Sequence, residues 1–408
     1  MVNALDVLRE RGFVKQITHD EPLRNLLGRE VVTAYVGLDP TADSLHIGHT
    51  VPIMAAAHLQ RAGHRPVVIL GGGTAMIGDP SGKTDLRQML TEAQIEANVR
   101  GIRTQLDRFL DFTDDKALCL NNMAWLRDLN YIAFLREVGV HFSVNRMLTA
   151  ECYKGRLDTG LSFIEFNYML LQSYDYLHLY RNLGCKLQMG GDDQWSNILG
   201  GADLVRRVER DEVYGITYPL VTTASGKKMG KTEEGAIWLN ATRTSPYDFY
   251  QYWRNTHDAD VAKFLAFFTF LPMDEVRRLS ALQGRDINLA KKILAFEATS
   301  IVHGAQLAKE AEQAAEALFE GGQDLSTIPM ATIAKEWLER GGSVVELLVQ
   351  TGIVPSKSEG RRLIQGGGLQ VNQKRVDKDD LVINMTFVRE GRIEVRRGKK
   401  QFVHVKPV

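Results

Sequence analysis

Two histidines stand three residues apart in the run His46-Ile-Gly-His49. A strand-like run, 31–36, precedes them, and a helical pattern, 50–62, follows them. The free N–H groups and positive dipole of a helix N-terminus attract phosphate, and two imidazoles add hydrogen-bond donors. Gly48 leaves the backbone flat enough for a purine to approach closely. The run therefore indicates a nucleotide-binding turn; alternatively, either histidine taken alone is a surface side chain at a helix start.

A second polar run, 225–232, contains three lysines and two glycines, and it follows a strand-like run at 218–221. Lysine ammonium groups on such a loop can meet phosphate charge when the loop closes over a nucleotide. Lys228 and Lys231 are the candidates for that contact. The alternative, for any lysine pair taken singly, is a solvated hairpin.

Three polar residues interrupt a mostly apolar helical pattern at 163–180. Tyr168, Gln172 and Asp175 are spaced by four and then three residues, so they share one helix face. Polar side chains on a buried face cost free energy unless they meet a ligand or internal partners. The spacing therefore predicts either a binding surface or a satisfied polar network between helices.

Two carboxylates follow glycines just after predicted buried strands. Asp79 comes after the strand 66–70 and a glycine-rich turn, and Asp193 follows the strand 185–189. Ligands of open α/β sheets bind at the carboxyl ends of the strands, so both are candidate ligand contacts. The run 78–84 is similar to a phosphate-binding P-loop, but Ile77 stands where that motif requires glycine. The alternative for Asp193 is a plain turn with an N-cap aspartate.

The bulk composition is that of a soluble globular protein. The 408 residues suggest two or three domains, with 44% hydrophobic and 25% charged residues. The net charge is zero, but residues 343–408 hold 13 Lys and Arg against 7 Asp and Glu, a net of +6. A basic tail on an acidic remainder points to RNA or another polyanion, or to a solvated basic face.

The chain carries no signal of export or of a structural metal. Cys119, Cys152 and Cys185 lack metal-ligand spacing and are odd in number, as expected in a reducing cytoplasm. No apolar run is long enough to cross a membrane, and the first 15 residues lack a signal-peptide core. We therefore expect a cytoplasmic protein.

The order of patterns predicts several domains. Strands alternate with helices over 1–240, among them a helical pattern over 123–138, which indicates an α/β domain with a parallel sheet. Residues 241–325 are helical in pattern, and 326–342 are expected to form a linker. Residues 343–408 read as two helices, at 344–350 and 358–365, and short alternating strands, a small α+β domain.

Taken together, these runs resemble the class I aminoacyl-tRNA synthetases, and 35–49 resembles the bacterial tyrosyl-tRNA synthetases in particular. The run 225–232 is similar to the second motif of that class, Lys-Met-Ser-Lys-Ser, with Gly230 in place of the middle serine and Thr232 in place of the last. The basic tail resembles the S4 RNA-binding fold. The resemblance covers nearly the whole chain in order.

This resemblance implies a Rossmann-like catalytic domain, an α-helical anticodon-side domain and an S4-like RNA-binding domain. It implies that ATP and L-tyrosine give tyrosyl-adenylate and pyrophosphate, and that tyrosine then passes to the 3′ end of tRNA(Tyr). An ionised amino-acid carboxylate needs no general base, so catalysis depends on positioning and on cations. Magnesium would arrive with ATP, without a protein metal site or prosthetic group, and the family is homodimeric.

The resemblance also implies roles for single residues. The implied catalytic residues are His46, His49, Lys83, Arg87, Lys228, Lys231 and Thr232. The implied tyrosine-binding residues are Asp79, Tyr168 and Gln172 for the ammonium group, Tyr35 and Asp175 for the phenol, and Gln194 for the carboxylate. The implied ATP-binding residues are Asp39, Thr41, Gly48, Gly191, Asp193 and Lys231.

Three other functions compete with this one. A tryptophanyl enzyme of the same class would need an indole pocket and normally lacks the S4-like tail. A nucleotidyltransferase with a related His-x-Gly-His turn is usually shorter. A synthetase-derived RNA-binding protein without catalysis would not need His46, His49, Lys228 and Lys231.

Overall fold

A computed structural model describes residues 2–81, 90–158, 160–223, 229, 231–232, 235–320, 329–372, 374–389, 391–398 and 401–408. For 231, 232 and 318–320 it describes the backbone only. The chain divides into two compact units, Met1–Glu312 and Gln313–Val408. In the described part of the chain, no helix is long and apolar enough to cross a membrane.

The first unit is built around a six-stranded sheet with the order β1-β6-β5-β2-β3-β4. Neighbouring strands from β6 to β4 are parallel, and β1 pairs antiparallel with β6 at one edge. Its strands are β1 (Gln16–Ile17), β2 (Thr33–Leu38), β3 (Arg65–Leu70), β4 (Leu118–Asn121), β5 (Cys185–Gly191) and β6 (Tyr214–Tyr218).

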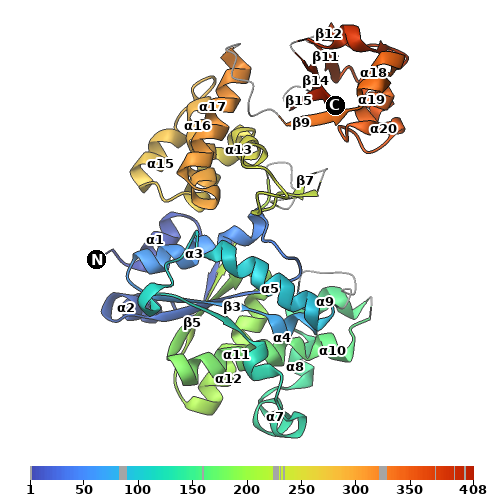
Figure 1. The fold of residues 1–408 in the computed structure, drawn as a ribbon. Coiled ribbons are helices and arrows are strands. Elements are labelled where there is room, and N and C mark those ends of the chain that lie inside the picture. Colours follow the sequence, from blue (N-terminus) through green and yellow to red (C-terminus); the bar gives the residue numbers. More distant parts are fainter. Residues whose placement is uncertain are drawn as a thin grey trace. The chain divides into compact units, whose positions relative to one another are not determined.

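The strand order reverses between β2 and β5. From β2 the chain crosses through α3 (Thr50–Arg61) to β3 on one side, and from β5 it crosses through α12 (Trp195–Glu209) to β6 on the other. Because right-handed crossovers in opposite directions use opposite faces, α3 covers one face of the sheet, while α11 (Tyr168–Leu183) and α12 cover the other (Figure 1). Such a reversal creates a crevice at the carboxyl ends of the strands, the usual ligand site of this architecture.

The remaining helices surround the sheet and continue into a helical layer of the same unit. Around the sheet lie α1 (Ala4–Glu10), α2 (Asp20–Arg29), α4 (Gly72–Ala75), α5 (Glu92–Leu106), α6 (Met123–Leu126), α7 (Tyr131–Glu137), α8 (Val144–Leu148), α9 (Glu151–Leu157) and α10 (Phe163–Phe166). The helical layer contains α13 (Pro246–Arg254), α14 (Val261–Phe268), α15 (Met273–Ser280), α16 (Ile287–His303) and the start of α17 (Ala305–Glu320).

The helical layer is tied to the sheet part by a buried arginine. Arg11 donates to the carbonyl oxygens of Ala266 and Thr269 at 3.0 and 3.1 Å, at the C-terminal end of α14. A cation is favourable at that end because the last carbonyls of a helix have no partner within it. A change of character near residue 240 was predicted, yet residues on both sides of it belong to one compact unit.

The second unit is a small α+β module with its own apolar core. A five-stranded sheet of order β12-β11-β14-β15-β9 packs with three helices. Its elements are β9 (Met330–Ile333), α18 (Lys335–Arg340), β10 (Gly342–Ser343), α19 (Val344–Gln350), α20 (Lys357–Gln365), β11 (Leu369–Val371), β12 (Lys374–Arg375), β13 (Val382–Ile383), β14 (Ile393–Arg397) and β15 (Gln401–Pro407).

The predicted linker, 326–342, differs from the structure. From Met330 onward the chain is ordered into β9 and α18, and Leu338 is fully buried in the core of the small unit. The reason is a long-range pairing, because β9 lies parallel to β15, about seventy residues further along. A four-residue strand carries too little local pattern to reveal such a partner.

The predicted architecture is otherwise confirmed: an α/β parallel sheet, then helices, then a small α+β module. Two elements differ in detail. The strand expected at 218–221 is β6, which ends at Tyr218, and the helix expected over 123–138 is broken into α6 and α7. Asn130 caps α7 by accepting from the amide of Ala133, which explains the new helix start.

Candidate active site

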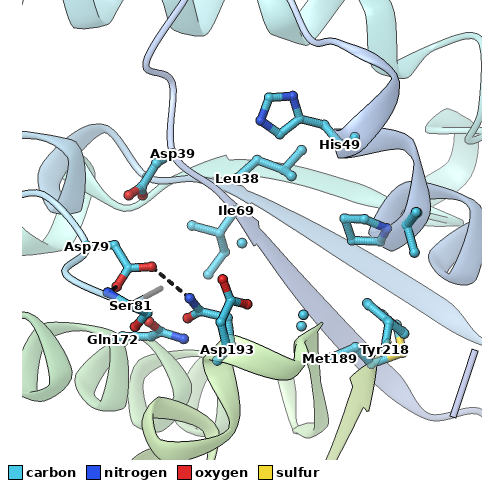
Figure 2. Close-up of a pocket in the computed structure, with 18 of the residues that line it drawn as sticks. Leu38, Asp39, His49, Ile69, Asp79, Ser81, Gln172, Met189, Asp193 and Tyr218 are labelled. Carbon is cyan, nitrogen blue, oxygen red and sulfur yellow. Dashed lines mark hydrogen bonds between the residues drawn. The ribbon is translucent and has the colours of Figure 1, made fainter. Parts of the chain in front are cut away.

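A cavity of about 440 Å³ opens at the strand-order reversal, where the carboxyl ends of β2, β3, β5 and β6 meet. Figure 2 shows Asp39, Asp79, Gln172 and Asp193 pointing into it from four separate segments. Its volume is in the usual range for sites that bind small molecules. The position agrees with the rule for open α/β sheets.

One end of the cavity is formed by the turn that contains the two histidines. The amide of Gly48 donates to Nδ1 of His46 at 3.0 Å, and the amide of His46 donates to Nδ1 of His49 at 3.2 Å. In a neutral imidazole whose Nδ1 accepts, the proton is on Nε2. Both rings therefore carry their proton on Nε2, and they lie side by side with centroids 3.9 Å apart.

Gly48 cannot carry a side chain in this turn. A Cβ there would lie 2.7 Å from Cε1 of His46 and 3.3 Å from the carbonyl oxygen of Met229. The ring of His46 would have to move, and with it the hydrogen bond that orients it. Glycine is therefore required by the closeness of the His46 ring and the 229 backbone.

The histidine turn is joined to the segment that follows the predicted lysine loop. The amide of Ile47 donates to the carbonyl of Ile237 at 3.0 Å, and the amide of Leu239 donates to the carbonyl of Leu45 at 2.8 Å. Between these bonds, His46 pairs with Trp238 as an antiparallel bridge. The segment 237–239, which follows the run 225–232 in the sequence, is thereby held beside the two histidines.

The other end of the cavity holds a buried carboxylate. Asp175, 4% exposed, accepts from Nδ2 of Asn122 at 2.9 Å and from Nε1 of Trp125 at 2.7 Å. Burial raises the pKa of Asp175 to about 7, these two donors oppose the rise, and the nearby Asp39 carboxylate adds to it. Asp175 is thus an acceptor whose charge is only partly compensated by the protein.

Beside Asp175, the hydroxyl of Tyr35 is buried and has no hydrogen-bond partner in the described part of the chain. Burial, followed by the nearby Asp175 charge, raises the pKa of this phenol well above its usual value. The side-chain oxygens of Gln172 and Gln188, which also line the cavity, are likewise unpartnered among the described residues. Buried polar atoms are rarely left unpaired, so this end is shaped for a polar ligand group.

Between the two ends, further carboxylates form a hydrogen-bonded group. Asp79 accepts from Nε2 of Gln194 at 2.7 Å, the bond drawn in Figure 2. Asp39 accepts from the hydroxyls of Thr74 at 3.0 Å and Tyr168 at 3.2 Å. Two carboxylates and a phenol give this middle section the chemistry to hold a cation such as an ammonium group.

The predicted residues fall into two groups. All predicted tyrosine-binding residues line this one cavity, and so do both histidines and the predicted ATP-binding residues other than Lys231. Lys83, Arg87 and Lys228 lie outside the described residues. Lys231 and Thr232 are described as backbone only, in β7 (Lys231–Thr232), which pairs with β8 (Gly235–Ala236).

The sequence interpretation missed four side chains around the Asp175 end of the cavity: Thr74, Asn122, Trp125 and Gln188. Asn122 directly follows β4, so the carboxyl-end rule that selected Asp79 could have selected it too. Trp125 carried no such signal, because its contact with Asp175 joins residues 50 positions apart.

Comparison with known proteins places the chain in a family. Residues 28–320 match the family described as tRNA synthetases class I (W and Y), and residues 320–405 match the tyrosine--tRNA ligase SYY-like C-terminal domain. The tyrosine--tRNA ligase of Clostridium botulinum strain Alaska E43 is 59% identical over 402 residues, and that of Caldanaerobacter subterraneus is 56% identical over 401 residues, each covering 98% of both chains.

This chain belongs to the tyrosine–tRNA ligase family. Solved members of the family share its fold. The C-terminally truncated mitochondrial enzyme of Aspergillus nidulans matches with a TM-score of 0.71 and 29% identity over 78% of this chain and 95% of that chain. A tryptophanyl-tRNA synthetase from Encephalitozoon cuniculi, at 14% identity and a TM-score of 0.57, shares the fold alone.

Proposed function

We propose that this chain activates L-tyrosine with ATP and transfers the tyrosyl group to the 3′ end of tRNA(Tyr). One observation carries the proposal: a single cavity is lined at one end by Tyr35 and Asp175, suited to a phenol, and at the other by His46 and His49, suited to phosphate. The 56 to 59% identity to tyrosine--tRNA ligases over almost the full chain supports the same reaction.

In the first step, a carboxylate oxygen of tyrosine attacks the α-phosphorus of ATP. The bond between the α-phosphorus and the bridging oxygen breaks, and pyrophosphate leaves with the bonding electrons. Tyrosine is already a carboxylate at neutral pH, so no protein base is needed. The Nε2–H donors of His46 and His49 act on the charge that develops on the phosphates.

In the second step, a hydroxyl of the terminal tRNA ribose attacks the carbonyl carbon of the adenylate. AMP leaves, and the hydroxyl proton leaves with it or passes to solvent. The adenylate stays in the cavity because its tyrosyl part remains held between Asp79 and Asp175, which lie in different segments of the cavity wall.

The proposed residue roles follow the cavity from end to end. Tyr35 and Asp175 meet the phenol, Asp79, Tyr168 and Gln172 the ammonium group, and Gln194 the carboxylate. Asp39, Thr41, Gly48, Gly191, Asp193 and Lys231 bind ATP. Lys83, Arg87, Lys228, Lys231 and Thr232 act on the leaving pyrophosphate, and their side chains are assigned from the sequence motif alone.

We propose that magnesium enters as part of its ATP complex and that no prosthetic group takes part. Among the described residues there is no cluster of three or more His, Cys, Asp or Glu side chains placed to hold a metal. A magnesium ion that bridges phosphates needs few protein ligands, because it keeps several waters.

We also propose a cytoplasmic homodimer. Large apolar side chains are exposed between residues 131 and 163, among them Ile132 at 64%, Val140 at 69% and Phe163 at 71%. A contiguous patch of exposed apolar side chains marks an interaction surface, and we propose that these side chains form one. A second copy is the proposed partner, and Phe163→Asp should shift the sedimentation coefficient toward that of a monomer, whereas Val31→Asp, equally exposed elsewhere, should not.

The domain roles complete the proposal: a catalytic domain over 1–240, helices over 241–325 on the anticodon side, and RNA binding by 343–408. Arg362 and Lys374 of the small unit are exposed and support an electrostatic contact with tRNA phosphates. Arg362→Glu with Lys374→Glu should weaken tRNA charging and its dependence on salt while pyrophosphate exchange stays unchanged.

The central experiment is ATP–pyrophosphate exchange with tyrosine, phenylalanine and tryptophan. Tyrosine alone should support rapid exchange. Lys228→Ala or Lys231→Ala should lower the rate of adenylate formation and leave the tyrosine dissociation constant unchanged, and Lys309→Ala on the exposed face of α17 is the matched control. Exchange with tryptophan in place of tyrosine, or no exchange at all, would contradict the proposed function.

A further inference from the structure

The two donors that hold the Asp175 carboxylate are themselves held very differently. Asn122 has three contacts: it donates to Asp175, donates to the hydroxyl of Thr74 at 3.2 Å, and accepts from the amide of Gly73 at 2.8 Å. The side chain of Trp125 has a single N–H group, and that group donates to Asp175. Its orientation must therefore come from packing.

The local backbone gives Trp125 little support. It lies on α6, a helix of four residues at the end of the edge strand β4, and its side chain is only partly buried. So short a helix has no stability of its own. Something beyond α6 must fix the plane of the indole.

The group that fixes the plane of the indole is an imidazole on α11. The ring of His178 is stacked on the indole of Trp125, with centroids 4.3 Å apart and planes within 12°. His178 comes three residues after Asp175, so both project from one face of a sixteen-residue helix. One turn of α11 therefore contacts the indole at two places: Asp175 accepts from its N–H group, and His178 stacks on its face.

We propose that His178 is a positioning residue for amino-acid selection, which acts through Trp125 by holding the indole N–H on the Asp175 carboxylate. The inference rests on the proposed function, in which Asp175 receives the hydrogen bond of the substrate phenol. A carboxylate oxygen has two lone-pair directions. With Trp125 on one direction of Oδ1, the other stays available to the cavity.

Loss of the stack affects tyrosine and phenylalanine differently. If the indole swings away, the buried carboxylate loses a donor that keeps it ionised, and the pKa of Asp175 moves further from its ordinary value. A protonated Asp175 is an uncharged and therefore weaker acceptor for a phenol. Phenylalanine makes no such hydrogen bond, so its activation does not depend on this arrangement.

A purely structural role of His178 makes another prediction. If the imidazole only fills space behind α6, its loss lowers thermal stability and slows activation of both amino acids in the same proportion. The ratio of kcat/KM for tyrosine to kcat/KM for phenylalanine separates the two roles, because overall stability cancels in the ratio.

The test uses full-length His178→Ala and His178→Phe, with the exposed Arg181→Ala, one turn further along the same helix, as the control. Pyrophosphate exchange gives kcat/KM for both amino acids, and thermal unfolding reports stability. His178→Ala should lower the ratio about three- to tenfold, the range expected for one lost aromatic pair, chiefly through KM for tyrosine. His178→Phe, which keeps a stacked ring, should restore the ratio to within about twofold.

A double-mutant cycle tests the route through the indole. Trp125→Phe removes the N–H group and should lower the ratio by itself; adding His178→Ala to it should then change the ratio no further. If His178→Ala does not fold, His178→Leu supplies the same comparison with similar volume and no aromatic stack. An unchanged ratio in His178→Ala or His178→Leu, or effects that add fully in the cycle, would overturn the proposal. Absence of tyrosine exchange in the unmutated chain would instead overturn the proposed function.

Discussion

The two ends of the cavity solve opposite electrostatic problems. At the end proposed to bind the phenol, Asp175 is almost fully buried and would offer an acceptor to a neutral hydroxyl. At the end proposed to bind phosphate, His46 and His49 are half-buried and would offer donors to groups that carry several charges. Burial makes an unpaired carboxylate expensive, so the first end discriminates between ligands. Partial exposure makes ground-state contacts weak, so the second end is suited to act on charge that builds up during reaction.

The largest expected effect comes from removing the acceptor of the buried end. Asp175→Ala should lower kcat/KM for tyrosine about 10²- to 10³-fold, or about 3 to 4 kcal/mol, because a charged hydrogen bond is lost and two buried donors lose their partner. Activation of phenylalanine should not share this loss. Pyrophosphate exchange with both amino acids measures this, with the exposed Asp128→Ala as control. An equal loss for both amino acids would show that Asp175 acts on folding and not on selection.

The donor end should show a smaller effect of a different kind. His49→Ala should lower the forward rate of adenylate formation about a hundredfold, the effect of losing one donor to developing charge. The dissociation constant of tyrosine should stay unchanged, because the imidazole lies at the other end of the cavity. Pre-steady-state measurement of adenylate formation separates the two constants, and His257→Ala, exposed in the helical layer, is the control. Weaker tyrosine binding at an unchanged rate of adenylate formation would contradict the separate roles proposed for the two ends of the cavity.

The pH dependence should distinguish the ends without a mutation. The pKa of Asp175 is raised to about 7, so the free carboxyl group is protonated below that pH and must lose its proton to offer the phenol a charged acceptor. We expect kcat/KM for tyrosine to fall as pH drops below about 7, approaching tenfold per pH unit, while kcat/KM for phenylalanine does not share the fall. Asp175→Asn should remove this dependence. A tyrosine profile that stays flat from pH 8 to pH 5.5 would contradict it.

The smallest expected effect concerns Tyr35. Its hydroxyl is buried without a partner in the described part of the chain, so Tyr35→Phe removes a group whose burial costs stability. The melting temperature should be unchanged or higher. Selectivity for tyrosine over phenylalanine should fall about three- to tenfold, the worth of one uncharged hydrogen bond. A clearly lower melting temperature would mean that the hydroxyl already has a structural partner.

The local elements were largely predictable because their signals are local. The sequence predicted helices at 50–62 and 344–350, and the structure has α3 at Thr50–Arg61 and α19 at Val344–Gln350. The spacing of Tyr168, Gln172 and Asp175 predicted a shared face, and all three line the cavity. Helical periodicity and the ends of strands are determined by residues that are close together in the sequence, so a single sequence reveals them.

What only the tertiary structure decided is which distant segments become neighbours. The placement of β5 beside β2 brings Asp193 and Gln194 to the cavity that holds His49, and the pairing of β9 with β15 turns an expected linker into part of a core. The hydrogen bond of Trp125 to Asp175 and its stack on His178 depend in the same way on the contact between α6 and α11. Such contacts form when the free energy gained by burying whole apolar faces exceeds the entropic cost of closing long loops. Both terms depend on residues far apart in the sequence, so no short stretch of sequence reveals the outcome.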